Sequence, residues 1–174
     1  AVASDSRFLY ELSSDPRVRA MSTRQDEFTF DEHERWYAEK RANGLNAIWI
    51  MESAEIPVAQ VRYGKVPRQS GHMCQYPACF VCGEAGLPEE RDRRRGAEIA
   101  ISVGPSEQRK GYALTLLRET MRMACDWLRV DTLVALVLRH NYASRRLFRK
   151  AGFRYVGMER GMDKSHARYE WRAP

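Results

Sequence analysis

The stretch GAEIAISVGPSEQRK, residues 96–110, decides the fold together with GYALTLLRETM, residues 111–121, which follows it directly. From Glu98 to Val103 large apolar residues alternate with small or polar ones, the period of two of a β-strand with two different faces. Gly104-Pro105 ends that strand, and apolar residues then recur at helical spacing. The sequence therefore predicts a strand, a short loop and an amphipathic helix in direct succession.

The loop before this helix has the composition of an anion site. In the pattern Q-x-x-G-x-A, Gly111 stands where a side chain would block a phosphate and Ala113 where the helix must stay slim. The first N–H groups of a helix have no partner within it, and the helix dipole adds about half a positive charge there. Taken alone, the loop leaves a plain strand-to-helix connection open as the alternative. The residues expected around the phosphates are Gln108, Arg109, Lys110, Gly111, Tyr112 and Ala113.

Two segments together resemble the GNAT superfamily of acetyl-CoA-dependent N-acyltransferases: AEIAISVGPSEQRKGYALTLL, residues 97–117, and HNYASRRLFRKAGFRYVG, residues 140–157. With the strands between and after them, the resemblance covers most of the chain from Ile48 to Trp171. It implies an α/β (α+β) fold with a mixed, mostly antiparallel central sheet and helices on both faces. Since the chain starts almost on its first helix, the first strand is expected to be short or missing. The implied reaction is transfer of the acetyl group of acetyl-CoA to a primary amine.

The composition favours one domain over residues 1–174, with an insertion at about 65–95 between two strands. The formal net charge is +6, but basic and acidic residues are interspersed, so a mixed solvated surface is expected rather than a nucleic-acid site. The apolar run Leu133 to Leu138 is far shorter than a membrane helix needs, and the first ten residues lack a signal-peptide core. We therefore expect a cytoplasmic protein that binds no membrane.

Around the central stretch, the patterns predict a mixed order of helices and strands. Asp31 is the expected N-cap of a helix over 31–41, and Ala54 and Glu55 are expected to connect two strands as a hairpin. The expected helices cover 5–14, 31–41 and 141–150, and the expected strands cover 46–52, 57–63, 132–138, 153–158 and 167–171.

The resemblance also assigns the cofactor strand. It implies that the pantetheine arm runs beside the strand near Ile101 and Val103, where this strand diverges from the one over 132–138. A backbone N–H there can stabilise the oxyanion, worth on the order of a few kcal/mol. Asn141 is the expected cap of the last helix, and the resemblance implies that its side chain touches the pantetheine amide, with Ser144 close by.

Glu98 is the candidate general base, because a superfamily subset has its base in such an A-E-I context. A structural carboxylate paired with an arginine is the alternative. Where the family often has a tyrosine that protonates the leaving thiolate, this chain has Phe148, which cannot donate a proton. Phe148 is interpreted as core or pantetheine packing, and Tyr142 is the candidate acid, with Tyr155 or water as alternatives.

The region SSDPRVRAMSTRQDEFTFDEHERWYAEK, residues 13–40, is expected to choose the small-molecule amine. It resembles acetyltransferases of nucleotide-linked amino sugars, as in pseudaminic acid synthesis, and, as the second branch, ribosomal-protein N-terminal acetyltransferases. The candidate substrate contacts are Arg17, Arg19, His33 and Trp36, with a solvated helix face anchored by Trp36 as the alternative. A non-catalytic acyl-CoA-binding module remains as a hypothesis from another class, motivated by Phe148 and the short N-terminus, and a homodimer is left open.

The insertion contains His72, Cys74, Cys79 and Cys82, and CFVCG resembles a metal knuckle. Zinc would suit these ligand types, but all four lie within a much shorter span than structural zinc sites usually use. Zinc therefore stays beside acetyl-CoA as an uncommitted candidate, and a loop of reduced thiols is the alternative.

Overall fold

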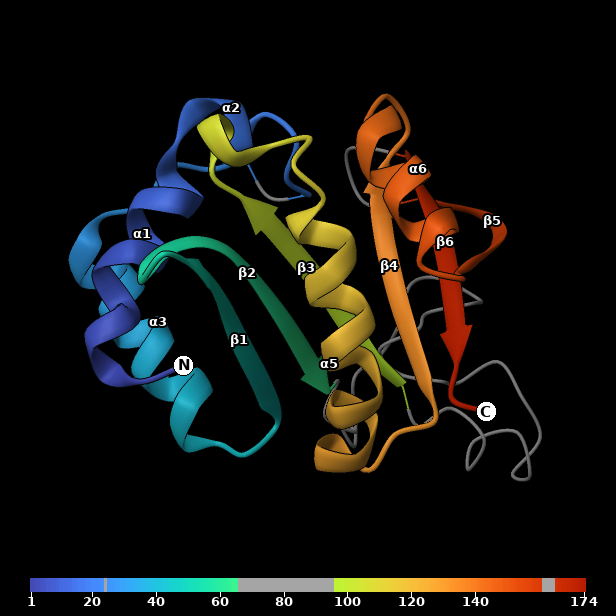
Figure 1. Ribbon diagram of the computed structural model, residues 1–174, viewed down its shortest axis with the longest axis horizontal. Helices are drawn as coiled ribbons and strands as arrows, with labels where there is room; N and C mark the ends of the chain where they lie inside the picture. Colours follow the sequence, from blue (N-terminus) through green and yellow to red (C-terminus); the bar gives the residue numbers. More distant parts are fainter. Residues whose placement is uncertain (24, 66–95, 161–164) are drawn as a thin grey trace.

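The computed structural model describes residues 1–23, 25–65, 96–160 and 165–174, and centres on a six-stranded sheet of order β1-β2-β3-β4-β6-β5 (Figure 1). Neighbouring strands are antiparallel except β3 and β4, which are parallel. The strands are β1 (Asn46–Ser53), β2 (Ile56–Lys65), β3 (Gly96–Val103), β4 (Thr132–Leu138), β5 (Arg154–Arg160) and β6 (Ser165–Arg172).

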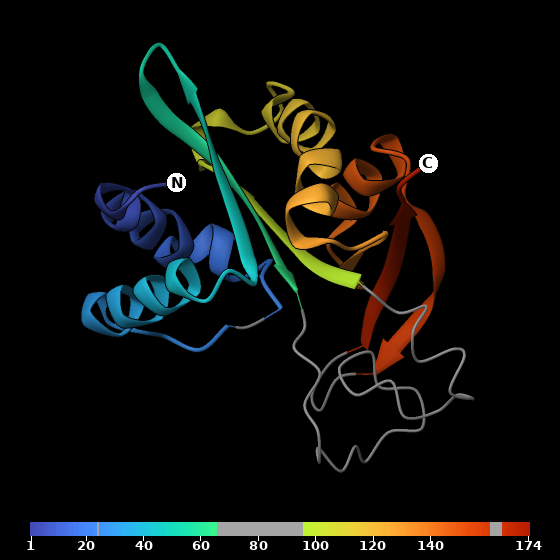
Figure 2. The same cartoon turned by 90° about the horizontal axis from the view of Figure 1, so that it is seen from below.

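Helices cover both faces of this sheet, as expected. Figure 2 shows the N-terminal helices on one face and the two later helices on the other. In the described part of the chain no strand precedes β1. The helical elements are η1 (Ala3–Asp5), α1 (Ser6–Ser14), α2 (Pro16–Arg19), α3 (Phe30–Ala42), η2 (Pro105–Glu107), α5 (Tyr112–Leu128) and α6 (Tyr142–Lys150).

The main core lies between the sheet and α5. Apolar side chains of alternate strand residues, such as Ile99 and Leu133, are buried there against the α5 stripe around Leu117. One polar pair is buried among them: the hydroxyls of Tyr63 and Thr120 are 2.8 Å apart, and Thr120 donates to a backbone carbonyl of its own helix. The pair is satisfied, so it fixes α5 to β2 without leaving a buried polar atom unbonded.

The start of α3 differs from the prediction. Its N-cap is Thr29 rather than Asp31: the Thr29 hydroxyl accepts from the Glu32 N–H at 3.3 Å, and the Glu32 carboxylate accepts from the Thr29 N–H at 2.7 Å. This is a reciprocal capping box, so the T-x-x-E spacing outweighs the aspartate in the first turn. Asp31 faces the positive end of the helix dipole instead.

The short helix α2 was not predicted. Pro16 is the first residue of α2, and Asp15 is its N-cap. Proline is well suited to this position because its missing N–H would have no partner there. As a result the chain turns sharply after α1 rather than entering an open loop.

The sequence analysis left a zinc site open and expected no membrane-spanning helix. The candidate zinc residues His72, Cys74, Cys79 and Cys82 lie outside the described residues. Among the residues that are described, no group of three or more His, Cys, Asp or Glu is arranged to hold a metal ion. Within the same residues, no helix combines the length and apolar character needed to cross a bilayer.

Candidate active site

Strands β3 and β4 diverge in the middle of the sheet. They are paired only over Gly96–Glu98 and Thr132–Val134. Beyond Glu98, β3 continues to its end paired with β2, while β4 continues to its end paired with β6. The facing edges of the two strands are therefore unpaired from the middle of the sheet upward, and they form a V that opens toward η2 and α6 (Figure 1).

The unpaired edge of β3 presents the backbone N–H groups of Ile101 and Val103, the two residues expected from the sequence to lie beside the pantetheine arm. Just past the strand, Gly104 donates its N–H to the carbonyl of Val58 on the β2 side, at 2.9 Å. Because successive N–H groups of a strand point to opposite edges, Ile101 and Val103 direct theirs toward β4. Past the paired segment β4 does not reach them. An extended molecule with amide groups can bond this edge like an added strand.

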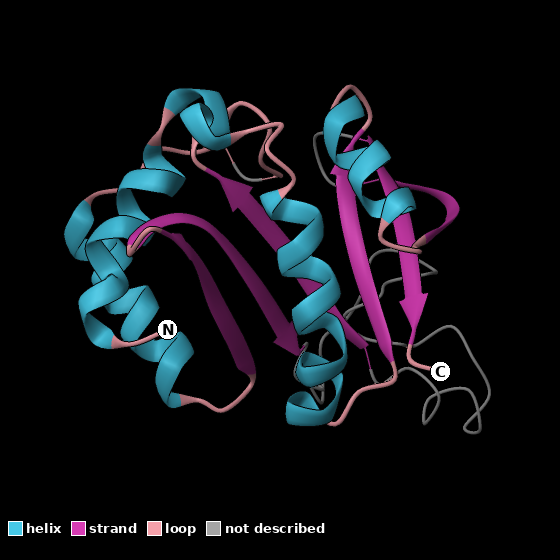
Figure 3. Cartoon of the chain, in the orientation of Figure 1, coloured by secondary structure: helices cyan, strands magenta, loops and turns pink. Residues whose placement is uncertain are grey.

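The loop between η2 and α5 is a second set of backbone donors and is drawn in pink in Figure 3. Gly111 is the N-cap of α5 and has φ +91°, and Arg109 has φ +67°. Such alternation of left-handed and right-handed residues turns successive N–H groups inward around an anion. In the described part of the chain, no acceptor is bonded to the N–H groups from Arg109 to Ala113. The dipole of a 17-residue helix adds to the positive potential at this point.

Side chains at the rim hold this loop, residues 108–113, in place. The Lys110 ammonium bonds both carboxylate oxygens of Glu107, at 3.0 and 2.9 Å, and the Tyr112 hydroxyl donates to the Ser53 hydroxyl at 3.1 Å. Gln108 and Arg109 are exposed, and a Cβ on Gly111 would meet nothing within 4 Å. Gly111 thus borders open space, and its backbone conformation is the feature that requires glycine.

Glu98 lies where the V begins. Its neighbours Ala97 and Ile99 belong to the core beneath α5, so Glu98 lies on the opposite face of the sheet, the one covered by α1 and α3. On the same face Arg62 places its guanidinium 4.9 Å from the centroid of the Trp36 ring. This face, which we call the acceptor face after the role proposed below, thus carries a carboxylate where the V begins. One strand away, on β2, it carries a cation that lies against an aromatic ring of α3.

Arg62 was missed by the sequence analysis. Its position follows from the register of two strands: Arg62 pairs with Ala100, which lies two residues from Glu98 and on the same face of the sheet. Only the pairing of β2 with β3 reveals that relation, and the sequence pattern alone does not supply it.

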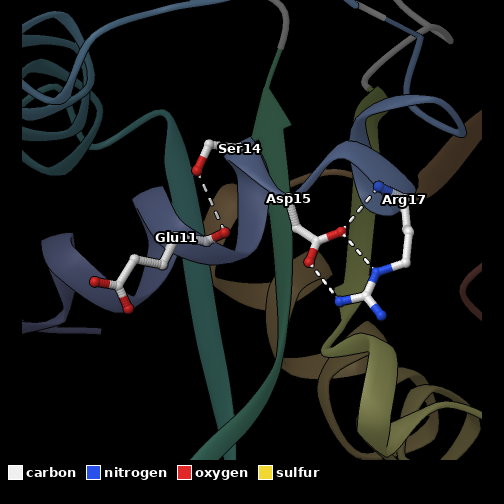
Figure 4. A network of polar contacts seen from close by, with 4 residues as sticks. All are labelled: Glu11, Ser14, Asp15 and Arg17. Atoms are coloured by element: carbon white, nitrogen blue, oxygen red, sulfur yellow. Dashed lines mark hydrogen bonds and ion pairs between the residues drawn. The ribbon is translucent and has the colours of Figure 1, made fainter.

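Arg17, an expected substrate contact, is engaged within its own turn. Its guanidinium donates to both carboxylate oxygens of Asp15, and its backbone N–H donates to the same carboxylate (Figure 4). The Arg17 hydrogen bonds lower the pKa of Asp15 to about 2. An incoming anion would have to compete with this carboxylate for Arg17.

Arg19 is engaged in a similar way. Both its Nε and one terminal nitrogen donate to the carbonyl of Asp26, and its guanidinium lies 4.3 Å from the centroid of the Phe28 ring. These contacts hold the segment that leads from α2 to α3.

His33 is in the interior, with 4% of its surface exposed. Its ring centroid is 5.5–6.0 Å from those of surrounding aromatic rings. Burial lowers its pKa. His33 therefore packs α1 against α3, and in this arrangement it presents almost no surface to a substrate. The surrounding rings belong to Tyr10, Phe28, Trp36 and Tyr37.

The residues expected on α6 occupy three different environments. Asn141 caps the helix by accepting from the Ser144 N–H at 3.0 Å, as predicted. Phe148 is in the core, 3% exposed, with its ring centroid 5.0 Å from that of Phe153. Tyr142, the candidate acid, is 73% exposed at the first residue of the helix. A proton from Tyr142 would therefore be exchanged close to bulk water.

With this geometry established, comparisons with known proteins identify relatives. A family model described as "Acetyltransferase (GNAT) domain" matches residues 1–154. The L-amino acid N-acetyltransferase AaaT of Escherichia coli (strain K12) is 29% identical over 109 residues, covering 53% of this chain and 67% of that protein.

Solved structures share the fold at low sequence identity. Ribosomal-protein-alanine N-acetyltransferase from Brucella melitensis aligns with a TM-score of 0.74 at 17% identity, covering 99% of this chain and 97% of that one. Spermidine N-acetyltransferase from Vibrio cholerae, in complex with CoA and spermine, aligns with a TM-score of 0.73 at 17% identity, covering 99% and 92%. Because the family model covers most of the chain, the chain belongs to the GNAT acetyltransferases and is an acetyl-CoA-dependent N-acyltransferase.

Proposed function

We propose that the chain transfers the acetyl group of acetyl-CoA to a primary amine by direct attack inside the V between β3 and β4. The observation that carries this proposal is the continuity of two donor sets along one path. The unpaired edge of β3 at Ile101 and Val103 leads directly into the N–H groups that surround Gly111. An amide-rich arm ending in a pyrophosphate matches that order of donors.

In this proposal the phosphate loop, residues 108–113, holds the pyrophosphate through backbone N–H groups. The side chains of Arg109 and Lys110 add positive charge at the rim, and Lys110 must share its ammonium with Glu107. The β3 edge bonds the pantetheine amides and keeps the thioester at the narrow part of the V. An N–H from Ile101 or Val103 then faces the charge that builds on the thioester oxygen.

Glu98 is the proposed general base. It stands where the strands part, on the acceptor face, so an amine entering from that face meets it beside the thioester. The amine must lose a proton as its nitrogen forms a bond to the acetyl carbon, and the carbon–sulfur bond then breaks. Glu98 takes the proton directly or through a water, and the thiolate is protonated by Tyr142 or by solvent. Since Tyr142 is exposed, water can replace it in this last step.

For the acceptor we propose a primary amine that also carries negative charge, with a nucleotide-linked amino sugar as the first candidate. The support is the contact of Arg62 with the Trp36 ring on the same face as Glu98, because a cation and an aromatic surface suit a phosphate beside a base. Of the substrate contacts expected from the sequence, Arg17 and Arg19 are bonded inside the protein and His33 is buried. A free amino acid is the second candidate, favoured by the named activity of the Escherichia coli relative.

The test measures CoA release from acetyl-CoA with a UDP-linked amino sugar, L-amino acids, spermidine, kanamycin and an N-terminal alanine peptide. We expect turnover with at least one anionic amine. In Glu98→Gln, kcat should fall about 100-fold or more, while the affinity for CoA in calorimetry stays within about twofold. Glu119→Gln, an exposed carboxylate on α5, is the matched control and should behave as the unsubstituted protein.

Two results would overturn the proposal. Binding of acetyl-CoA without acetylation of any amine would support a non-catalytic acyl-CoA-binding module instead. Strong preference for the alanine peptide would move the acceptor to protein N-termini, the other branch that the sequence resembles.

A further inference from the structure

We propose that Asn141 is a positioning residue that fastens the loop after α2 to the β4 arm of the V. Its side chain joins segments 120 residues apart: Nδ2 donates to the carbonyl of Met21 at 3.2 Å, while Oδ1 accepts from the Ser144 N–H at 3.0 Å. Only 8% of Asn141 is exposed. The bond to Met21 is thus largely shielded from competing water.

The direction of the Asn141 amide is determined by its neighbours. Ser144 offers an N–H, which needs an acceptor, and Met21 offers a carbonyl, which needs a donor. Rotating the amide by 180° would place two donors face to face and two acceptors face to face. The helix cap and the bond to Met21 therefore select the same orientation and support each other.

Among the described residues, the other bonds of the loop after α2, residues 20–23, lie within its own turn or come from Gln25, whose side-chain amide donates to the Ala20 carbonyl at 2.8 Å. Met21 and Ser22 donate their N–H groups to the carbonyls of Val18 and Arg19, at 3.1 and 3.0 Å, and the Ser22 hydroxyl bonds Val18 as well. These bonds shape the turn but do not connect it to the sheet. Asn141 supplies such a connection, because its own N–H is bonded to Leu138, the last residue of β4, at 2.9 Å.

If acetyl transfer takes place in the V, as proposed above, the bond between Asn141 and Met21 affects how the acceptor binds. β4 is the arm that leaves β3 after Val134, and the loop belongs to the helices that cover the acceptor face. Asn141 therefore sets where the acceptor-side loop stands relative to the open edge. Because both of its polar atoms are bonded inside the protein, Asn141 acts on the acceptor through this loop. The sequence resemblance instead implies a direct contact with pantetheine, and the two roles differ in what they predict.

The decisive variant is Asn141→Asp. Aspartate keeps an oxygen for the cap, but it cannot donate to Met21 and it turns a negative charge toward that carbonyl. We expect hydrogen exchange at the Met21 and Ser22 amides to rise at least fivefold, while CoA affinity in calorimetry stays within about twofold. With a UDP-linked amino sugar as acceptor, KM for the sugar should rise about tenfold, the loss expected for one buried hydrogen bond, and KM for acetyl-CoA should not change.

Asn43→Asp is the matched control. It makes the same change of charge at the end of α3, where the Asn43 oxygen accepts from Leu45 and Asn46 and no donation is lost. It should leave exchange at Met21 and both KM values unchanged. Asn141→Ser serves as a second variant if the aspartate prevents folding, because a short hydroxyl can cap α6 but cannot reach Met21.

Weaker CoA binding with unchanged exchange at Met21 would overturn the proposal in favour of the pantetheine contact. Unchanged exchange together with unchanged KM values would also overturn it. If the unsubstituted protein acetylates none of the tested amines, the proposed function fails. The exchange and calorimetry measurements still decide the role of Asn141, because neither requires turnover.

Discussion

Helices α5 and α6 begin at the same end of the sheet, because they follow the parallel strands β3 and β4. Their first turns differ in whether a side chain caps them. α5 starts at Gly111, whose missing side chain leaves the first N–H groups open. α6 starts at Asn141, whose side chain occupies that place and bonds the Ser144 N–H. An unfilled helix terminus leaves N–H groups that can bond an anion, whereas a filled one contributes to the stability of the fold. In the proposed function, the chain binds the pyrophosphate with the α5 terminus and holds a neighbouring loop with the α6 terminus.

The largest effect is expected when the open terminus is filled with negative charge. In Gly111→Asp the carboxylate competes with phosphate for the same N–H groups, and CoA affinity should fall about 100-fold or more in calorimetry, or about 2.7 kcal/mol. Gly44→Asp is the matched control, because Gly44 also has positive φ, at +64°, and also has open space at its Cβ position. It carries the same backbone strain far from the loop. Equal losses in both variants would attribute the effect to strain and refute the phosphate assignment.

A smaller effect is expected when the capping side chain of α6 is removed. Asn141→Ala removes both the cap of α6 and the bond to Met21, so the free energy of unfolding in urea should fall by about 1–2 kcal/mol. Asn141→Ser, which keeps a hydroxyl for the cap, should lose less. If both variants unfold at the same urea concentration as the unsubstituted protein, the α6 terminus contributes no stability and the contrast with α5 fails.

Much of this contrast could be predicted from the sequence. The strand ending at Gly104 and the cap at Asn141 depend on neighbouring residues, so local patterns were sufficient for them. The N-cap of α3 was mislocated because an aspartate two residues later made a plausible competitor to Thr29. The role of Arg62 and the partner of Asn141 depend on contacts between distant segments, which only the folded chain brings together.

The first residues of the two helices offer the smallest and most closely matched test, because both are tyrosines. The Tyr112 hydroxyl bonds Ser53 at the end of β1, whereas Tyr142 is exposed and, in the described part of the chain, its hydroxyl bonds no other residue. Tyr112→Phe should therefore lower the free energy of unfolding by about 0.5–1.5 kcal/mol and weaken CoA binding two- to fourfold, because the rim of the phosphate loop loses a support. Tyr142→Phe should change neither quantity, and a fall in kcat in that variant would identify its hydroxyl as the proton donor to the thiolate. If Tyr142→Phe weakens CoA binding as much as Tyr112→Phe does, the two termini are not functionally distinct, and the assignment of the pyrophosphate to α5 alone is wrong.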